Sequence, residues 1–306
     1  MINIVDTVIY IISFLAIWMG SQKIVSSIDK IARRAKISSF ILSFVVLGLA
    51  TSVPELAVGI TAISQGKPDI FVGNLLGGIS IIFLFIIPLL AILANGVAFN
   101  SNINHHKLLL CLFIAVTPLL FLLDKSLTQN EALLEIGFYV LAFMLIKQKA
   151  SLPRGKLQFK FRDLAWAMAG LLTVYISANV LVEKTIEFAE IFSITPFLIS
   201  LVIVSFGTNL PELFVAIQAV ILRKKDVALG DYAGSALANV LFMGLFTFLL
   251  GGNLYIDRNF TPTLILISLG LLLFYYFASS KNSISRKEGF VLLGFYSVFV
   301  TSQALG

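Results

Sequence analysis

Two glutamates, Glu55 and Glu212, lie inside long apolar stretches of the sequence. A charged side chain in the hydrocarbon core of a membrane costs at least about 3 kcal/mol, so such residues face a partner, a cavity or an ion. No Lys or Arg occurs in the central part of these stretches, which argues against an ion pair that only ties helices together. Two neighbouring carboxylates repel unless a cation lies between them. The pair therefore predicts a cation site.

Hydroxyl and amide side chains stand three and four residues before each glutamate. In a helix this spacing places them on the same face as the carboxylate. Hard cations such as Ca²⁺ and Na⁺ prefer an all-oxygen environment, whereas thiols and imidazoles would indicate softer metals. The ligands predicted beside Glu55 and Glu212 are Thr51, Ser52, Thr208 and Asn209.

A proline stands directly before each glutamate, at Pro54 and Pro211. Proline has no amide hydrogen, so each one removes the helical donor of the carbonyl four residues earlier. The carbonyl oxygens of Ala50 and Gly207 are therefore predicted as further oxygen groups near the site.

The glutamates belong to an internal repeat with a constant offset of 157 residues. Residues 43–82 align on residues 200–239 without a gap, and the alignment matches Pro-Glu-Leu in both copies. Five predicted crossings separate the copies, and an odd number inverts the second copy in the membrane. This is the inverted-repeat plan of secondary transporters, whose substrate site lies near the midplane. The glycines that also align are Gly73 with Gly230 and Gly77 with Gly234.

The composition excludes an ordinary soluble protein. Of 306 residues, 58% are hydrophobic and 12% charged, and mean hydropathy is +0.99; a soluble domain has about twice that charged fraction. Cys111 is the single cysteine, so no intramolecular disulfide or CxxC centre can form. The apolar runs have the length that crosses a bilayer core of about 30 Å. About ten spans are predicted, near residues 4–20, 38–64, 69–94, 107–123, 132–147, 163–182, 192–222, 227–250, 262–278 and 288–304.

The basic residues predict the orientation of these spans. Eighteen of the 22 Lys and Arg residues fall in the odd-numbered connections. By the positive-inside rule both termini then lie outside the cytoplasm, in a multi-pass protein of the plasma (inner) membrane. The predicted organisation is a first five-helix repeat (1–147), a basic cytoplasmic linker (148–162) and a second five-helix repeat (163–306). The linker carries no aromatic residues in a stacking pattern, so no nucleic-acid partner is expected.

The doubled motif resembles the two α-repeats of the sodium/calcium exchanger family, within the cation/calcium exchanger superfamily. The resemblance is carried by GLATSVPELAVGITA (48–62) and SFGTNLPELFVAIQA (205–219), followed by GNLLGGISII (73–82) and GDYAGSALAN (230–239). It implies an all-α polytopic membrane protein of about ten helices in two inverted repeats. It also implies that Glu55 and Glu212 bind Ca²⁺ and Na⁺ alternately, with the four neighbouring ligands named above and Ser235 of the eighth span.

The sequence departs from the family pattern in the third and eighth spans. Where relatives carry a serine and, four residues later, an Asn or Asp, the third span has Gly78 and Ile82. The eighth span keeps Ser235 but has Asn239 where an Asp is common. Ser80 could supply a ligand only if its helix were rotated or bulged. The site is thus expected to hold two carboxylates, with Asn239 as an amide ligand.

These observations predict a secondary-active antiporter that exchanges Ca²⁺ or a related divalent cation for Na⁺ or H⁺ by alternating access. A cation channel or leak, and a transport-inactive cation-binding homologue, remain alternatives. No enzyme activity and no cofactor are expected, and no P-loop motif for ATP hydrolysis occurs. The predicted partners are inorganic cations and the lipid bilayer; the sequence sets no oligomeric state.

Overall fold

The computed structural model describes residues 4–34, 48–99, 105–146, 160–213, 226–227, 229–251 and 254–305. The chain divides into two compact units. Unit 1 comprises Met1–Gly77 and Lys147–Pro211, and unit 2 comprises Gly78–Ile146 and Glu212–Gly306. Each unit therefore combines a stretch of each predicted repeat.

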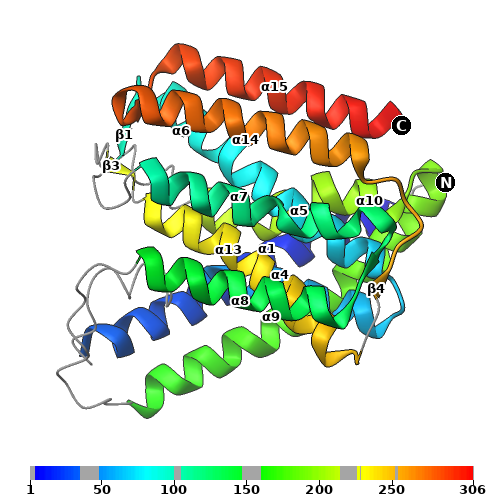
Figure 1. The fold of residues 1–306 in the computed structure, drawn as a ribbon. Helices are drawn as coiled ribbons and strands as arrows, with labels where there is room; N and C mark the ends of the chain where they lie inside the picture. The colour runs from blue at the N-terminus through cyan, green and yellow to red at the C-terminus, as the bar shows by residue number, and fades with distance from the viewer. Residues whose placement is uncertain are drawn as a thin grey trace. The chain divides into compact units, whose positions relative to one another are not determined.

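Unit 1 is built around two long helices, α1 and α9, which pack along each other (Figure 1). They have 31 and 32 residues, and their first residues are 157 positions apart. The predicted spans 4–20 and 163–182 ended too early, because no Gly or Pro interrupts the polar continuation of either helix. The elements of unit 1 are α1 (Ile4–Arg34), α3 (Gly48–Thr51), α4 (Val53–Ser64), the first part of α5 (Pro68–Ile81), α9 (Phe161–Phe192), α10 (Pro196–Ile199), the π-helix η4 (Ser200–Val204) and α11 (Ser205–Thr208).

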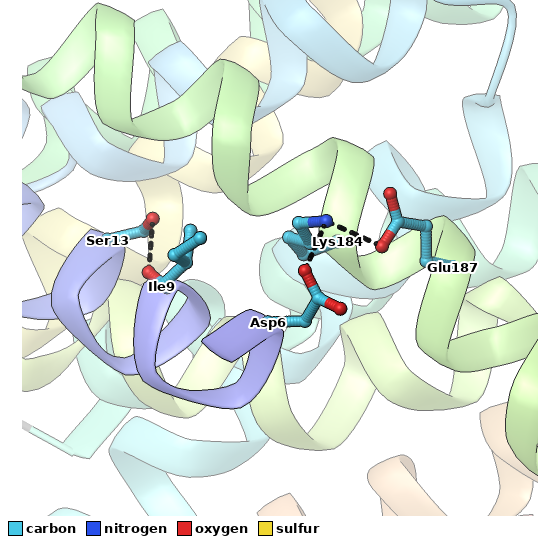
Figure 2. Close-up of polar contacts among 5 residues, drawn as sticks. All are labelled: Asp6, Ile9, Ser13, Lys184 and Glu187. Carbon is cyan, nitrogen blue, oxygen red and sulfur yellow. Dashed lines mark hydrogen bonds and ion pairs between the residues drawn. The ribbon is translucent and has the colours of Figure 1, made fainter. Parts of the chain in front are cut away.

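Small residues and one ion-pair cluster hold α1 against α9. A Cβ atom added at Gly20 would lie 2.9 Å from the carbonyl oxygen of Gly170, so the backbones touch there. Toward one end of the pair, Lys184 Nζ lies 2.9 Å from Asp6 Oδ1 and 2.7 Å from Glu187 Oε2 (Figure 2). The two helices are thus fixed to each other by backbone contact and by charge.

The described part of unit 2 contains its helices and five short strands, which lie in the connections between helices. Its helices α14 and α15 pack on each other, and α15 also packs on α6 (Figure 1). The predicted spans 69–94, 107–123, 132–147, 227–250, 262–278 and 288–304 agree with the helices within a few residues. The elements are the end of α5, the π-helix η2 (Ile82–Ile86), α6 (Ile87–Leu93), β1 (Val97–Phe99), α7 (His105–Phe121), the 3₁₀-helix η3 (Leu122–Asp124), β2 (Ser126–Leu127), α8 (Gln129–Ile146), β3 (Asp226–Val227), α13 (Leu229–Leu249), β4 (Leu254–Tyr255), α14 (Thr261–Lys281), β5 (Ser283–Ile284) and α15 (Arg286–Leu305).

The strand pairs of unit 2 repeat with the same offset of 157 residues. Strand β1 pairs antiparallel with β5, with Val97 opposite Ile284, and also parallel with β3. Strand β2 pairs antiparallel with β4, with Leu127 opposite Leu254. Adding 157 to Val97 gives Leu254, and subtracting 157 from Ile284 gives Leu127. These matched strands extend the repeat beyond residue 82, where the aligned sequence segments end.

The helices that follow β2 and β5 also begin alike. Glu131 Oε2 accepts hydrogen bonds from the backbone N–H and the hydroxyl of Thr128, and Glu288 Oε2 accepts the same pair from Ser285. Both are capping boxes, which satisfy backbone donors at a helix start. Residues 128 and 285 are again 157 apart, so α8 and α15 are equivalent helices.

An exposed ion pair lies in the connection that holds β2. Lys125 Nζ lies 2.6 Å from Asp257 Oδ1, and the hydrogen bond to Asp257 raises the pKa of Lys125. The backbone N–H of Ile256 donates to the carbonyl of Lys125 at 2.9 Å. Side chain and backbone thus both tie this connection to the segment after β4.

Seven helices in the described part of the chain are long and apolar enough to cross a membrane. Two shorter apolar helical segments, Val53–Ser64 and Pro196–Thr208, belong to the second and seventh predicted spans. The remainder of those spans, residues 38–47 and 214–222, and most of the linker, residues 148–159, lie outside the described residues. The seventh span was predicted from residue 192, but Phe192 ends α9 and the next helix begins at Pro196.

Candidate ion-binding site

Glu55 lies in the first turn of a helix that follows a break in the backbone. Helix α3 ends at Thr51, and α4 begins at Val53 with Pro54 in its first turn. Between them Ser52 has φ −85° and ψ 12°, outside the helical region. Proline favours a first helical turn because its missing N–H has no partner there in any case. The break therefore follows from the Ser-Val-Pro-Glu sequence.

The second copy of the motif breaks in the same way. Helix α11 ends at Thr208, and Asn209 has φ −88° and ψ 11°. Ser52 and Asn209 are 157 residues apart and have nearly the same backbone angles. The backbone N–H of Asn209 donates to the Ser205 carbonyl at 3.1 Å, so the helical hydrogen bonds of α11 continue up to this break.

In unit 1 a side chain of the second motif, Asn209, forms a hydrogen bond with the glutamate of the first motif, Glu55. Asn209 Nδ2 donates to Glu55 Oε1 at 3.0 Å, and the same amide group donates to the Ser205 carbonyl at 2.9 Å. Both side chains are buried, with 1% of Glu55 and 1% of Asn209 exposed. A hydrogen bond to a charged group is worth about 1.5 to 3 kcal/mol. The amide therefore fixes the orientation of the carboxylate.

Asn74 on α5 joins this cluster. Thr208 Oγ1 donates to Asn74 Oδ1 at 3.1 Å, and Asn74 is fully buried. Asn74 aligns with Asp231 at the offset of 157 residues, and it was not among the ligands predicted from the sequence. The signal that could have identified it is its place between Gly73 and Gly77, because residues between close-packed glycines face a helix crossing.

The glycines of the repeat let α5 approach η4. A Cβ atom at Gly73 would lie 2.6 Å from the Phe197 carbonyl, and one at Gly77 would collide with Leu201 and Ser205. The hydroxyl of Ser200 donates to the Ile70 carbonyl across the same crossing. The contact between the helices brings Asn74 within reach of Thr208.

The remaining predicted ligands are buried but lie partly in the other unit. Thr51, Ser52 and Thr208 are in unit 1, with at most 6% exposed. Glu212, Ser235 and Asn239 are in unit 2, with at most 5% exposed. Ser235 and Asn239 are four residues apart on α13 and so share a helix face.

The third predicted span contains the kind of bulge that Ser80 would need. The π-helix η2 begins at Ile82, two residues after Ser80, and η2 packs against α13. Ser80 and Ile82 are both fully buried. π-Bulges change the face that neighbouring side chains present and occur frequently at functional sites. Ser80 is therefore a further oxygen group to consider in unit 2.

The chemistry of the site is that of buried oxygen groups. The described residues hold no group of three or more His, Cys, Asp or Glu side chains that could bind a metal ion. The cluster in unit 1 instead combines one carboxylate with amides and hydroxyls. Such neutral oxygens suit hard cations that bind and leave again.

A family model described as "Sodium/calcium exchanger protein" matches residues 5–147 and 163–305. The chain belongs to the sodium/calcium exchanger family. Its members are transporters, and the chain is a multi-pass membrane protein of this family.

Curated relatives match over nearly the whole chain. A putative antiporter, CaxA of Alkalimonas amylolytica, is 28% identical, covering 95% of this chain and 96% of its own. The sodium/calcium exchanger MaX1 of Methanosarcina acetivorans is 27% identical, covering 97% of both chains.

Solved structures confirm the polytopic helical fold. A crystal structure of the H⁺/Ca²⁺ exchanger CAX matches with a TM-score of 0.78 at 17% identity, over 98% of this chain and 86% of that one. The sodium-calcium exchanger NCX_Mj, soaked with Na⁺ and Sr²⁺, matches with a TM-score of 0.70 at 20% identity, over 98% of this chain and 99% of that one.

Proposed function

We propose that the protein is a secondary-active antiporter that exchanges Ca²⁺ or a related divalent cation for Na⁺ or H⁺ by alternating access. The observation that carries the proposal is the buried hydrogen bond from Asn209 to Glu55, made between the two matched helix breaks. Through this bond, an amide of the second repeat orients the carboxylate of the first. Glu55 and Glu212 serve as the shared ligands that the competing ions occupy in turn.

The neighbouring oxygen groups complete the proposed coordination. Thr51, Ser52, Thr208 and Asn209 supply hydroxyl, amide or backbone oxygens, and Asn74 adds an amide that the sequence did not select. When a cation binds Glu55, the Asn209 amide can turn its oxygen toward the ion, because Oδ1 and Nδ2 lie on the same planar group. Ser235 and Asn239 contribute from α13.

The charge of the proposed site favours an electroneutral cycle. One divalent cation cancels the two carboxylates, and so do two monovalent cations. Ile82 replaces the third-span Asn or Asp of the family pattern, and Asn239 is neutral, so no third acidic side chain of this set raises the charge. The expected exchange is therefore two monovalent ions for one divalent ion.

The names of the relatives support transport of a divalent cation, but they differ in the ion that is exchanged for it. MaX1 is named a sodium/calcium exchanger, whereas CAX is titled an H⁺/Ca²⁺ exchanger. We propose the plasma (inner) membrane as the location, with both termini outside the cytoplasm, from the distribution of Lys and Arg.

Ion flux in proteoliposomes tests the proposal. Uptake of radioactive Ca²⁺ should depend on an imposed Na⁺ or H⁺ gradient and should not respond to a membrane potential. Glu55→Gln and Glu212→Gln should each abolish exchange while the protein stays folded in detergent, and Glu183→Gln on the exposed face of α9 is the matched control. Gradient-independent uptake would favour a channel, and Ca²⁺ binding without flux would favour a binding-only homologue.

A further inference from the structure

A further buried carboxyl group, Glu135, lies in the first half of α8 and has no part in the site described above. Its side chain is fully buried, and neither carboxyl oxygen has a hydrogen-bond partner among the described residues. The hydroxyls of Tyr139 on α8 and Thr247 on α13 are buried in the same way and also lack a partner there. An ionised carboxylate in such surroundings is strongly disfavoured.

Glu135 lies on the face of α8 that packs closely against α13 at Gly244. A Cβ atom at Gly244 of α13 would lie 2.9 Å from Glu135 Cβ and 2.6 Å from the Ala132 carbonyl. Tyr139 is one turn from Glu135, and Thr247 is one turn from Gly244, so all three polar groups lie along the faces that meet. The contact at Gly244 leaves no room there for a hydrated cation.

The internal repeat shows that packing does not require these polar groups. At the offset of 157, Glu135 corresponds to Leu292 on α15 and Thr247 corresponds to Leu90 on α6, and both leucines are buried. The equivalence holds in three dimensions. Gly289, which corresponds to Ala132, packs on α6 with its added Cβ 2.8 Å from the Pro88 carbonyl. The contact between α15 and α6 (the α15–α6 seam) is therefore filled by two leucines. The equivalent contact between α8 and α13 (the α8–α13 seam) carries a carboxyl and a hydroxyl group.

Charged groups on the packed elements do not compensate Glu135. Helix α8 packs on α13 and α7. In these three helices the basic side chains are His105, His106 and Lys107. They stand at the start of α7, whereas Glu135 lies near the short connection that joins the end of α7 to α8. The acidic residue on α8 is Glu131, one turn before Glu135, which caps α8 through Thr128. The sequence of α13 has Asp231 in its first turn, thirteen residues before Gly244.

The other titratable residues of these helices are Cys111 of α7, Tyr139 of α8 and Tyr232 of α13. We propose that Glu135, together with Tyr139 and Thr247, forms a proton-binding site in the seam between α8 and α13, and that its proton holds this seam closed. The ligand is a proton because the helices meet too closely at Gly244 for a hydrated cation, and because α7, α8 and α13 place no basic side chain beside Glu135. The hydroxyls of Tyr139 and Thr247 can accept from, or donate to, a protonated carboxyl. This site is additional to the eight predicted ion ligands and does not depend on the proposed exchange.

Infrared spectroscopy of the purified full-length protein tests for the proton. At neutral pH the wild type should show the carbonyl absorption of a protonated carboxyl, and Glu135→Gln should lose it. Glu131→Gln, four residues earlier on the same helix, is the matched control and should keep it. A wild-type spectrum without this absorption, or an undiminished absorption in Glu135→Gln, would overturn the proposal.

The pH dependence of thermal unfolding tests the closed seam. The folded state holds a proton that the unfolded state releases, so stability falls as pH rises. Glu135→Leu copies the residue of the equivalent seam and should unfold at a temperature that falls less with rising pH than that of the wild type. If Glu135→Leu does not fold, Glu135→Gln replaces it, and its unfolding temperature should also fall less with rising pH than that of the wild type. Equal pH slopes in the wild type and in a folded variant would contradict the inference.

Discussion

Asn209 donates a buried hydrogen bond of 3.0 Å to Glu55, although the two residues are 154 positions apart in the sequence. Asn209 is itself the residue at which the second motif leaves the helical conformation, as Ser52 is in the first. A break in one repeat thus provides the partner for the carboxylate in the other. The two copies of the motif are therefore joined by a buried hydrogen bond as well as related in sequence.

Replacing Asn209 tests this link. Asn209→Ala removes the donor that orients Glu55 and leaves a buried carboxylate oxygen without it. Ca²⁺ affinity should fall by about 1 to 3 kcal/mol, the cost of an unsatisfied buried partner, which corresponds to roughly 5-fold to 150-fold. Isothermal titration measures this change.

The matched control for that change is Asn179→Ala. Asn179 donates to the Tyr175 carbonyl one turn earlier on α9 and is exposed at that bond. Its replacement should leave Ca²⁺ affinity unchanged. Equal affinities for the wild type and Asn209→Ala would show that this amide does not orient the ligand.

The repeat selected the residues of the candidate site from the sequence. Pro54 and Pro211 marked the places where a helical hydrogen bond is lost, although each predicted span was continuous there, and the oxygen-bearing residues beside Glu55 and Glu212 are all buried. The glycines beside Asn74 mark a close helix crossing, but its burial depends on how closely α5 approaches η4. That distance is set by residues more than a hundred positions away, which periodicity within one helix does not report.

The ends of α1 and α9 were missed for a different reason. Hydropathy marks where a helix leaves the membrane, whereas Gly, Pro and caps mark where it ends. Helix α1 continues to Arg34 and α9 to Phe192 without a Gly or Pro after the apolar part. The Glu135 seam was overlooked because the repeat was followed only to residue 82, before the fifth span.

Gly77 should be intolerant of any side chain. Gly77→Ala places a methyl group against Leu201 and Ser205, so α5 must move away from η4. Overpacking of this kind costs about 1 to 3 kcal/mol and should lower the temperature of thermal unfolding. It should also weaken Ca²⁺ binding, because Asn74 and Thr208 meet at the same crossing.

Gly137→Ala is the control for Gly77. Gly137 lies on the exposed face of α8, and an added Cβ would meet no atom within 4 Å. Alanine stabilises an exposed helix by roughly 0.5 to 1 kcal/mol relative to glycine. If Gly77→Ala were as stable as Gly137→Ala, the close packing of α5 on η4 would be wrong.

The predicted orientation can be tested by cysteine labelling. In a Cys111→Ser background, Gly155→Cys in the basic linker should react with an impermeant reagent only from the cytoplasmic side. Asn130→Cys, an exposed position in an even-numbered connection, should react only from outside. Labelling of Gly155→Cys from outside would reverse the assignment of the two faces.

The departure of the third span from the family pattern at Gly78 and Ile82 gives a further prediction. Ile82 is the first residue of η2 and is fully buried in unit 2, where an Asn or Asp is expected. Gly78→Ser with Ile82→Asn returns two oxygen-bearing side chains to this helix. The double variant should alter the selectivity between Na⁺ and Ca²⁺ or add monovalent binding, and Ile82→Val, which keeps an apolar side chain, should not.

Asn239 supplies the opposite test on α13. In the family pattern the third and eighth spans both supply oxygen ligands. Position 82 has no oxygen-bearing side chain here, so we expect Ser235 and Asn239 of the eighth span to supply these ligands alone. Asn239→Ala should therefore weaken cation binding by about 1 to 3 kcal/mol, the scale for a lost partner at a buried charged group. Isothermal titration with Na⁺ and with Ca²⁺ measures both variants. Unchanged affinities in Asn239→Ala and in the double variant would mean that these helices do not line the site, because a restored or deleted ligand must change the free energy of the bound ion.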